Sequence, residues 1–440
     1  MLNINFHKLN EKIRDVNVTY YEGIVKNVIG LTIEVCGIKA FVGEVCIIYT
    51  DNNKINCEVV GFKEENVILM PLGELTGIAP GCRVVPTGKA LNVNCSYELL
   101  GKVLDGIGNP FDEEEYEVLG GERYAMDACP PDPLKRRRIK DILPTGVRAI
   151  DGFLTCGEGQ RIGIFAGSGV GKSTTLGMIA REAKADVNVI ALIGERGREV
   201  KDFLEKDLGE EGLKKSVIVC ATSDKPALVR LKGAFTATAI AEYFRDQGKK
   251  VILMMDSVTR FAMAQREIGL AIGEPPATKG YTPSVFAMLP RLMERAGTSQ
   301  AGSITAFYTV LVDGDDFNEP IADAVRGILD GHIVLSRKLA AQNHYPAIDI
   351  LSSVSRLMSE IAIPEHKKAA SFARNLLSTY KEAEDLINIG AYASGSSKDI
   401  DMAIKYHPAL IKYLRQYVDE KSSIEESVGT LVNLFQGIEI

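Results

Sequence analysis

A glycine-rich stretch in the middle of the chain combines residue types that bind phosphate. Residues 161–177 read RIGIFAGSGVGKSTTLG, an apolar strand-like segment followed by glycines and a helix-like segment. Backbone N–H groups in such a turn and the positive end of the following helix cradle phosphate. The Lys172 side chain can reach the terminal phosphates, and the Ser173 hydroxyl can ligate Mg²⁺. The predicted nucleotide contacts are Ala166, Gly167, Ser168, Gly169, Val170, Gly171, Lys172, Ser173 and Thr174.

The first position of this loop departs from the strict pattern. A glycine is expected five positions before Gly171, and Ala166 stands there. That position needs only a small side chain beside the strand end, so Ala166 is compatible with phosphate binding. The competing interpretation is a glycine-rich structural turn without a ligand.

Two acidic residues follow apolar strand-like segments and could complete a nucleotide-hydrolysing site. Asp256 ends the run VILMMD, and Glu195 follows ALIG. Because ligands bind at the carboxyl ends of parallel strands, both side chains are expected at that edge of a sheet. Asp256 is predicted to complete the Mg²⁺ side, the alternative being a helix N-cap. Glu195 is predicted to orient or deprotonate the attacking water, the alternative being a surface ion pair with Arg196 or Arg198.

Three types of sequence succeed one another and predict three domains. Residues 1–90 contain short runs rich in Val, Ile, Tyr and Phe, cut by Gly, Pro, Asn and Asp, which predicts a small β-barrel. Residues 91–365 alternate apolar strands with helical stretches, which is typical of an α/β fold with a mostly parallel sheet and flanking helices. Residues 366–440 carry an apolar stripe at helical spacing and predict a C-terminal helical domain.

The N-terminal end has a pattern of its own. Leu2, Phe6, Leu9 and Ile13 fall at spacings of three and four residues, so residues 2–14 are expected to form a short amphipathic helix. This helix could be an arm that binds a partner, and the alternative is a frayed terminus.

The composition excludes several classes of protein. The 440 residues are 46% hydrophobic and 25% charged, with a net charge of −7, which is typical of a soluble globular protein. The run KRRR at 135–138 is too short to cover a nucleic-acid surface, so no nucleic-acid partner is expected. No apolar run reaches the length of a membrane span, and no secretory signal is evident. The eight cysteines form no CxxC pair and no metal spacing, so they are expected to be reduced.

Several longer motifs resemble the rotary ATPase superfamily. Besides AGSGVGKST and GERGRE, they include GEPPATKGYTPSVFAMLPRL (273–292), DGDDFNEPIADAVRGILDGHIVLSR (313–337) and HYPAIDILSSVSR (344–356). Within that superfamily, the sequence from about residue 20 to residue 440 resembles the flagellar protein export ATPases and their relatives, the ATPases of type III secretion injectisomes. The resemblance implies the same three parts: barrel, nucleotide-binding core and helical C-terminal domain.

The resemblance also implies roles for the residues already singled out. ATP and Mg²⁺ are the implied cofactors. Lys172 and Ser173 would hold phosphate and Mg²⁺, and Asp256 would complete the Mg²⁺ side. Glu195 is the implied catalytic carboxylate, with Arg196 beside it.

Two further residues receive roles only from the resemblance. Arg356 matches the family's arginine finger, and Tyr345 matches the position at which the catalytic subunit of rotary ATP synthases stacks a tyrosine on adenine. In the synthase head, one subunit type carries the catalytic Glu and its neighbour donates the finger. This chain carries both Glu195 and Arg356, so a homo-oligomer is expected. Its contacts would be head-to-tail and would close into a ring, for which the resemblance implies six subunits.

The predicted function is ATP hydrolysis that energises or primes protein export through the flagellar type III secretion apparatus. The alternative is the ATPase of an injectisome. An RNA-translocating ATPase fits the acidic balance poorly, and a non-catalytic rotary subunit would lack Glu195. The implied partners are a stator-like regulatory protein at the N-terminal arm, export-gate and stalk components, and export chaperones with their cargo. The expected location is cytoplasmic, peripheral at the inner-membrane export apparatus.

Overall fold

The structure is a computed structural model that describes residues 21–111, 121–312 and 316–437. The predicted arm at 2–14 lies outside these ranges. The chain divides into two compact units, one holding residues up to Leu91 with Ile268–Glu274, the other holding Asn92–Glu267 with Pro275–Ile440. Within the described ranges, every helix is too short or too polar to cross a membrane.

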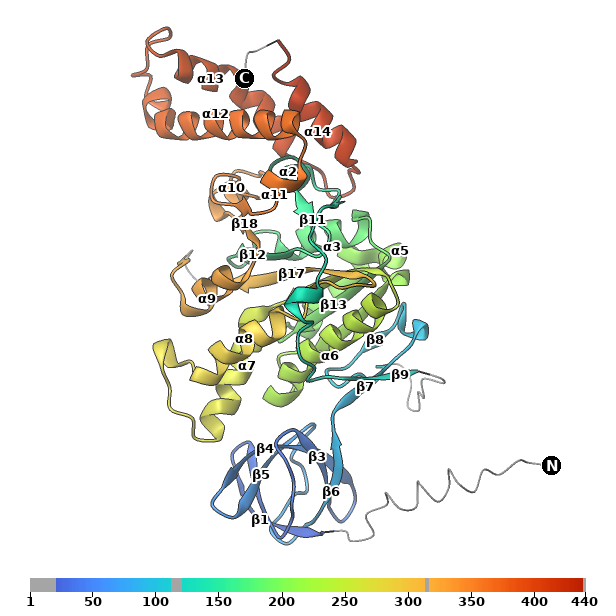
Figure 1. Ribbon diagram of the computed structural model, residues 1–440. Coiled ribbons are helices and arrows are strands. Elements are labelled where there is room, and N and C mark those ends of the chain that lie inside the picture. Colours follow the sequence, from blue (N-terminus) through green and yellow to red (C-terminus); the bar gives the residue numbers. More distant parts are fainter. Residues whose placement is uncertain (1–20, 112–120, 313–315, 438–440) are drawn as a thin grey trace, which may run out of the picture. The chain divides into compact units, whose positions relative to one another are not determined.

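The first unit contains a closed β-barrel with the strand order β1-β2-β5-β4-β3-β6 (Figure 1). Its strands are β1 (Gly23–Ile29), β2 (Thr32–Cys36), β3 (Glu44–Tyr49), β4 (Lys54–Lys63), β5 (Asn66–Pro71) and β6 (Arg83–Ala90). Apolar side chains such as Ile33, Val35 and Leu69 are fully buried and fill the interior. The barrel predicted from the short Val- and Ile-rich runs is therefore confirmed.

The second unit is built on a mostly parallel sheet with the order β19-β18-β12-β17-β15-β13-β14-β8 and with β16 beside β17. Its strands are β8 (Val103–Leu104), β12 (Arg161–Ala166), β13 (Val187–Ile193), β14 (Ser216–Ala221), β15 (Lys250–Asp256), β16 (Gly297–Thr298), β17 (Ser303–Leu311), β18 (Gly331–Leu335) and β19 (Val354–Ser355). Only β16 and β19 pair antiparallel among these strands. The central strands are mostly apolar and are buried along almost their whole length, because helices cover the sheet.

Helices and short elements connect these strands. The helices are α2 (Arg148–Phe153), α3 (Lys172–Glu182), α4 (Gly197–Asp202), the π-helix η3 (Phe203–Leu208), α5 (Gly209–Lys214), α6 (Ala227–Asp246), α7 (Val258–Ala271), α8 (Pro283–Met293), α9 (Pro320–Ile328), α10 (Arg337–Ala341) and α11 (Met358–Ile361). Single 3₁₀ turns are η1 (Tyr97–Leu99), η2 (Pro133–Lys135) and η4 (Thr278–Gly280), and two small sheets pair β7 (Asn92–Cys95) with β9 (Glu122–Ala125) and β10 (Ile142–Leu143) with β11 (Cys156–Gly157). The long helix α6 packs against β13, β14 and β15. The predicted α/β fold is confirmed.

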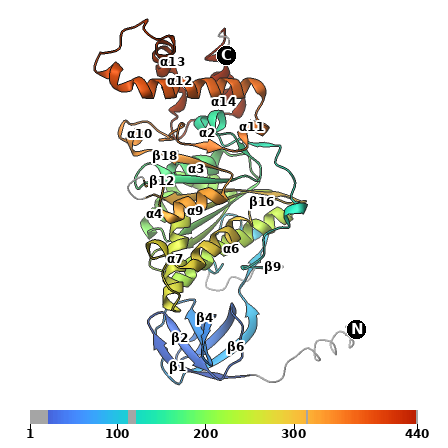
Figure 2. The ribbon, with the colours of Figure 1, turned by 60° about the vertical axis from the view of Figure 1, so that its left-hand side comes forward.

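Three helices close the chain: α12 (Pro364–Asn388), α13 (Lys398–Leu414) and α14 (Ile424–Asn433). They pack on one another and on α2, as both ribbon views show (Figures 1 and 2). Two polar contacts join α12 to α2, a buried one from His366 to the Gly152 carbonyl at 2.7 Å and a part-buried one from Arg374 to the Phe153 carbonyl at 3.0 Å. The predicted C-terminal helical region is confirmed, and it belongs to the same compact unit as the sheet.

A buried ion pair ties α6 to the segment that follows α8. The Arg295 side chain is fully buried, and its Nε and Nη2 donate to the two carboxylate oxygens of Glu242 at 3.0 and 2.5 Å. Its Nη1 donates to the Met126 carbonyl at 2.5 Å. Such a bidentate pair is stable inside a protein only while both charges are present.

Replacing Arg295 by Met should lower the free energy of unfolding by about 3–5 kcal/mol, because Glu242 would lose its bidentate partner and keep only Arg245, 4.0 Å away, as a cation. Urea denaturation measures this change. The control is Arg326→Met, which removes an exposed pair with Asp323 at 2.7 Å and should cost less than about 1 kcal/mol. Equal losses in the two variants would contradict a structural role for the buried pair.

Candidate nucleotide-binding site

The phosphate loop lies between the end of β12 and the start of α3. Ala166 is the last residue of β12, where it pairs with Leu311 on one side and Leu335 on the other, and its side chain is buried. Ala166 is thus accommodated in the buried end of the strand, where a small side chain can take the place of Gly. Gly169 and Gly171 have φ angles of 77° and 86°, a left-handed backbone that favours glycine. The loop therefore turns sharply and lets α3 begin at Lys172.

A buried cluster of three charged side chains faces the loop. The Lys172 Nζ lies 2.5 Å from Oδ1 of Asp256 and 3.5 Å from Oε1 of Glu195. β13 and β15 are neighbours, with Leu192 opposite Asp256, so their carboxyl ends bring the two acidic residues to the same edge. The hydroxyl of Thr309 on β17 donates to the same Asp256 oxygen at 2.7 Å. Sequence reasoning placed both carboxylates at this edge, and the structure brings them together around Lys172.

Burial and charge shift the titration of this cluster. Burial alone would lower the pKa of Lys172, but Asp256 and Glu195 outweigh it, so the pKa lies above its ordinary value and the amine stays charged. Burial and the charge of Asp256 raise the pKa of Glu195 to about 7, although Lys172 opposes the shift. A carboxylate with a pKa near neutrality can accept and release a proton at physiological pH, as a general base must.

Other predicted residues lie near the loop without joining this cluster. Ser173 and Thr174 form the first turn of α3, directly after Lys172. The Arg196 side chain is 79% exposed and lies 3.6 Å from Glu199. It extends away from the buried carboxylates, and the structure does not place it with them. Arg198 pairs with Asp202 at 3.7 Å, so neither arginine forms the surface ion pair considered as the alternative for Glu195.

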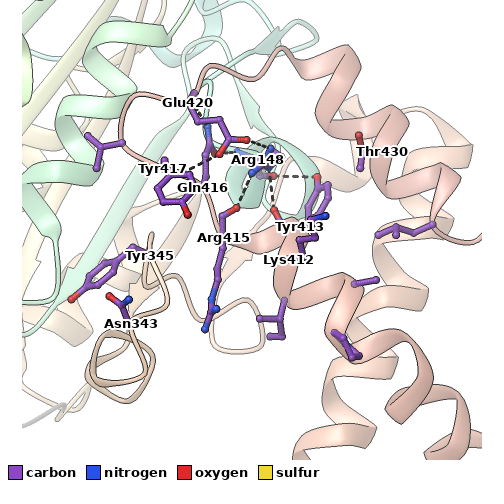
Figure 3. Close-up of a pocket in the computed structure, with 15 residues that line it drawn as sticks. Arg148, Asn343, Tyr345, Lys412, Tyr413, Arg415, Gln416, Tyr417, Glu420 and Thr430 are labelled. Carbon is purple, nitrogen blue, oxygen red and sulfur yellow. Dashed lines mark hydrogen bonds and ion pairs between the residues drawn. The ribbon is translucent and has the colours of Figure 1, made fainter.

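A pocket of about 1080 Å³ lies on the other side of Tyr345, a residue that neighbours the phosphate loop. Its wall includes Tyr345, whose ring lies so close to Gly171 that a Cβ there would be 3.5 Å from Cε1. The chain between α13 and α14 forms another wall, including Tyr417, and Figure 3 shows both tyrosine rings bordering the pocket. Arg148 holds this chain in place, donating to the carbonyls of Tyr413 and Arg415 at 3.1 and 2.7 Å and pairing with Glu420 (Figure 3). The pocket is large enough for a nucleoside.

Arg356 lies far from this cluster. It directly follows β19, which pairs with the first residues of β18, so it sits at the amino ends of the parallel strands. The phosphate loop lies at their carboxyl ends. β12 runs from one end to the other over Arg161–Ala166, six residues that span about 20 Å at 3.3 Å each. The side chain is exposed.

Sequence reasoning missed two arginines beside the loop. Arg337 begins α10 at the end of β18, and a Cβ on Gly167 would come within 2.6 Å of its Nε. The stem of Arg260 packs on Gly194, the residue before Glu195, and its Nε is buried without a hydrogen-bond partner among the described residues. Both arginines follow the carboxyl end of a parallel strand, and this position was the sequence signal that could have pointed to them. A buried unpaired donor beside a phosphate loop indicates an anionic ligand.

Comparison with known proteins agrees with this geometry. Residues 146–355 match the nucleotide-binding domain of the ATP synthase alpha/beta family, and residues 25–88 match its beta-barrel domain. Residues 362–433 match the T3SS EscN ATPase C-terminal domain. The chain is 59% identical to the flagellum-specific ATP synthase of Bacillus subtilis, over 94% of each chain. The chain belongs to the family of the flagellum-specific ATP synthases and type 3 secretion system ATPases.

Further members of the family are similar over the same length. The type 3 secretion system ATPase of Xanthomonas euvesicatoria is 51% identical over 94% of this chain and 93% of its own. The solved structure of the assembled ATPase EscN from the enteropathogenic E. coli type III secretion system has a TM-score of 0.89 and 48% identity, covering 94% of this chain and 99% of that one. The family resemblance predicted from the motifs is therefore confirmed. The phosphate loop, Glu195 and Asp256 lie inside the matched nucleotide-binding domain.

The raised pKa of Glu195 predicts a stability change in the nucleotide-free protein. Unfolding returns the carboxyl to an ordinary pKa near 4.5, so its burial destabilises the fold increasingly from pH 4.5 to 7 and fully above 7. Glu195→Gln should therefore raise the melting temperature at pH 8 and leave it unchanged at pH 4.5. Calorimetry at both pH values measures this difference, with Glu205→Gln, whose side chain is 62% exposed, as control. An equal change at both pH values would contradict the assigned shift.

Proposed function

We propose that this protein hydrolyses ATP and thereby energises or primes protein export through the flagellar type III secretion apparatus. The observation that carries the proposal is the buried contact of Lys172 with Glu195 and Asp256 beside the phosphate loop. The 59% identity to a flagellum-specific relative, against 51% to a type 3 secretion relative, supports the flagellar system. The ATPase of an injectisome is the second candidate, because members of both systems match along the whole chain.

The geometry supports a definite placement of ATP. The phosphates would lie on the N–H groups of the loop and the start of α3. Lys172 would leave Asp256 and bind the terminal phosphates, and the unpaired Nε of Arg260 would find an acceptor there. The adenine would occupy the pocket between Tyr345 and Tyr417, where an aromatic ring can stack on it.

The residues also fit a Mg²⁺ ion. Mg²⁺ prefers oxygen ligands, typically one or two from the protein with the rest from phosphates and water. The Ser173 hydroxyl and the Asp256 carboxylate would hold it, since both lie at the carboxyl edge of the sheet beside Lys172. When bound, Mg²⁺ neutralises charge on the phosphates. Thr309 keeps the Asp256 oxygen oriented throughout.

Glu195 is the group proposed to activate water. The Glu195 side chain is nearly buried, and it is not held by the Thr309 hydroxyl that orients Asp256. Its pKa of about 7 suits proton transfer at neutral pH. The carboxylate would orient the attacking water and accept its proton, while Lys172 stabilises the charge on the phosphates. Arg196 remains a proposed neighbour of the site whose side chain would have to turn inward.

The position of Arg356 supports a ring of identical subunits. It is separated from the chain's own phosphate loop by the length of β12, about 20 Å, so its side chain cannot reach that loop. A neighbouring subunit placed head-to-tail would receive it at its nucleotide site, and repetition would close a ring, which we propose to have six members. The related EscN has been solved assembled and with its central stalk EscO.

The remaining partners follow from the family. We propose a stalk component in the ring, export-gate components, chaperones with cargo, and a stator-like regulator at residues 2–14, which lie outside the described ranges. The proposed location is cytoplasmic and peripheral at the inner-membrane export apparatus. No nucleic-acid partner is proposed.

Glu195→Gln should retain ATP binding and lose turnover, because the amide has the same shape but cannot accept a proton. Lys172→Ala should lose turnover and bind ATP more weakly, since a charge-assisted phosphate contact disappears. Nucleotide-binding titrations and phosphate-release assays separate the two effects. Lys201→Ala on exposed α4 serves as the control and should keep both properties. Normal turnover in Glu195→Gln would remove this residue from the catalytic role.

Arg356→Ala alone should lower turnover about 10³–10⁵-fold, as other arginine fingers do. Co-assembly of this variant with Glu195→Gln should restore activity, because an intact Glu195 of one subunit can face an intact Arg356 of the next. With random mixing, about a quarter of the interfaces (one half times one half) combine both groups. Phosphate release from the mixture measures the recovery. No recovery in rings shown to contain both variants would contradict action between subunits.

A further inference from the structure

The strand that ends in the phosphate loop begins at a second polar cluster. Gln160 directly precedes β12 and is fully buried. Its side-chain amide Nε2 donates to the Asp330 carbonyl at 3.0 Å and to the Ser355 hydroxyl at 3.3 Å. The same Asp330 carbonyl accepts the backbone N–H of Arg356 at 3.1 Å. The buried amide of Gln160 therefore holds Ser355, the residue before Arg356. It also holds the Asp330 carbonyl, which accepts a hydrogen bond from the Arg356 backbone.

The remaining contacts fix this cluster in one arrangement. Oε1 of Gln160 accepts the N–H of Gly157 at 2.8 Å, so Nε2 is the atom that faces Asp330 and Ser355. The Ser355 hydroxyl donates to the Thr155 carbonyl at 2.8 Å. Every polar atom of the Gln160 side chain and of the Ser355 hydroxyl thus has a partner inside the fold, which restricts how Ser355 can move.

Asp330 is also held to β12 by several hydrogen bonds. Its Oδ2 accepts both the backbone N–H and the Nε of Arg161 at 3.1 Å, and its Oδ1 accepts Nη2 at 3.2 Å. Its own N–H donates to the Arg161 carbonyl at 2.9 Å. The arginine and carboxylate form a bidentate pair, the geometry that gives the most directional ion pair.

Arg356 itself contrasts with this rigid surrounding. Its backbone is held by Asp330, whereas its side chain is exposed and makes no hydrogen bond or ion pair with the residues that the structure describes. A fixed backbone and a free guanidinium are what a residue needs in order to act on a neighbouring molecule. A purely structural arginine would instead use its donors within its own chain.

We propose that Gln160 and Asp330 are positioning residues that aim Arg356 at the nucleotide site of the neighbouring subunit. The proposal rests on the proposed action of Arg356 between subunits and adds the residues that hold the Arg356 backbone in the required position. Neither residue can touch the ATP of its own subunit, since β12 separates them from their own phosphate loop by about 20 Å. A displacement of about 1 Å in a reacting group can cost about 10²-fold in rate, so a loosened cluster would impair the finger while it remains present.

Gln160→Met tests the proposal, because methionine has a similar length and no donor. The variant should bind ATP normally and turn over about 10²-fold more slowly. Mixed with Glu195→Gln, it should regain activity, since its intact Glu195 meets an intact finger. Mixed with Arg356→Ala, it should regain none, since neither subunit supplies a well-placed finger. Ser355→Ala is a smaller change and should show the same recovery with Glu195→Gln and the same lack of recovery with Arg356→Ala. It replaces Gln160→Met in the test if that variant does not fold.

A matched control separates positioning from general stability. Asn188 is another fully buried amide, which donates to the Ala180 carbonyl at 2.9 Å at the start of β13. Asn188→Leu should lower the melting temperature in the same way as Gln160→Met and keep normal turnover per folded ring.

Each outcome of the mixing experiment has one meaning. Recovery of Gln160→Met with Arg356→Ala would place its defect at its own nucleotide site, and recovery with neither partner would show a general structural defect. Either result overturns the positioning role, as would undiminished turnover in both Gln160→Met and Ser355→Ala. Failure of the reference mixture of Glu195→Gln with Arg356→Ala would overturn action between subunits itself, whatever Gln160 does.

Discussion

The parallel direction of the central strands decides which residues of this protein can meet. β12, β13, β15, β17 and β18 all run the same way, so their carboxyl ends form one edge of the sheet and their amino ends form the other. The phosphate loop, Glu195 and Asp256 lie at the first edge, and Gln160 and Arg356 lie at the second. No side-chain movement can exchange groups between edges about 20 Å apart. The proposed roles of the two edges, nucleotide binding at one and donation of Arg356 to a neighbouring subunit at the other, follow from this constraint.

The contact of Lys172 with the two carboxylates is the second constraint. A buried ammonium without partners would be strongly unfavourable, and so would Glu195 and Asp256 side by side without a cation. The cluster satisfies both requirements while no phosphate is bound, and the raised pKa of Glu195 shows that the balance is incomplete. Phosphate binding would draw Lys172 away and leave the carboxylates in need of a new cation. Nucleotide and Mg²⁺ would therefore bind more favourably together than either alone.

Local sequence predicted what lies within one strand and the turn after it. The phosphate loop, Asp256 and Glu195 are strand-end residues, and the alternation of strands and helices places such residues at one edge without knowledge of tertiary contacts. Tyr345 and Arg356 could not be found in this way, because their environments depend on segments far away in the chain, and only the family resemblance pointed to them. Arg337 and Arg260 also follow strand ends, but nothing local distinguishes a phosphate-facing arginine from an exposed one. Gln160 has no sequence signal, since its role depends on where Asp330 and Ser355 come to lie.

The same two strands connect both functional ends of one subunit. β12 begins beside Gln160 and ends where the phosphate loop starts. β18 begins beside Asp330 and ends at Leu335, two residues before Arg337, whose side chain lies beside Gly167 of that loop. Strands buried in the middle of a sheet resist bending, so a shift of the loop on nucleotide binding would move the opposite ends as well. Those ends hold Arg356, the residue proposed to act on the next subunit. In a head-to-tail ring of such subunits, nucleotide binding at one site would therefore affect the position of Arg356 at the next site. This coupling provides a physical route to sequential ATP hydrolysis in a ring made of a single type of chain.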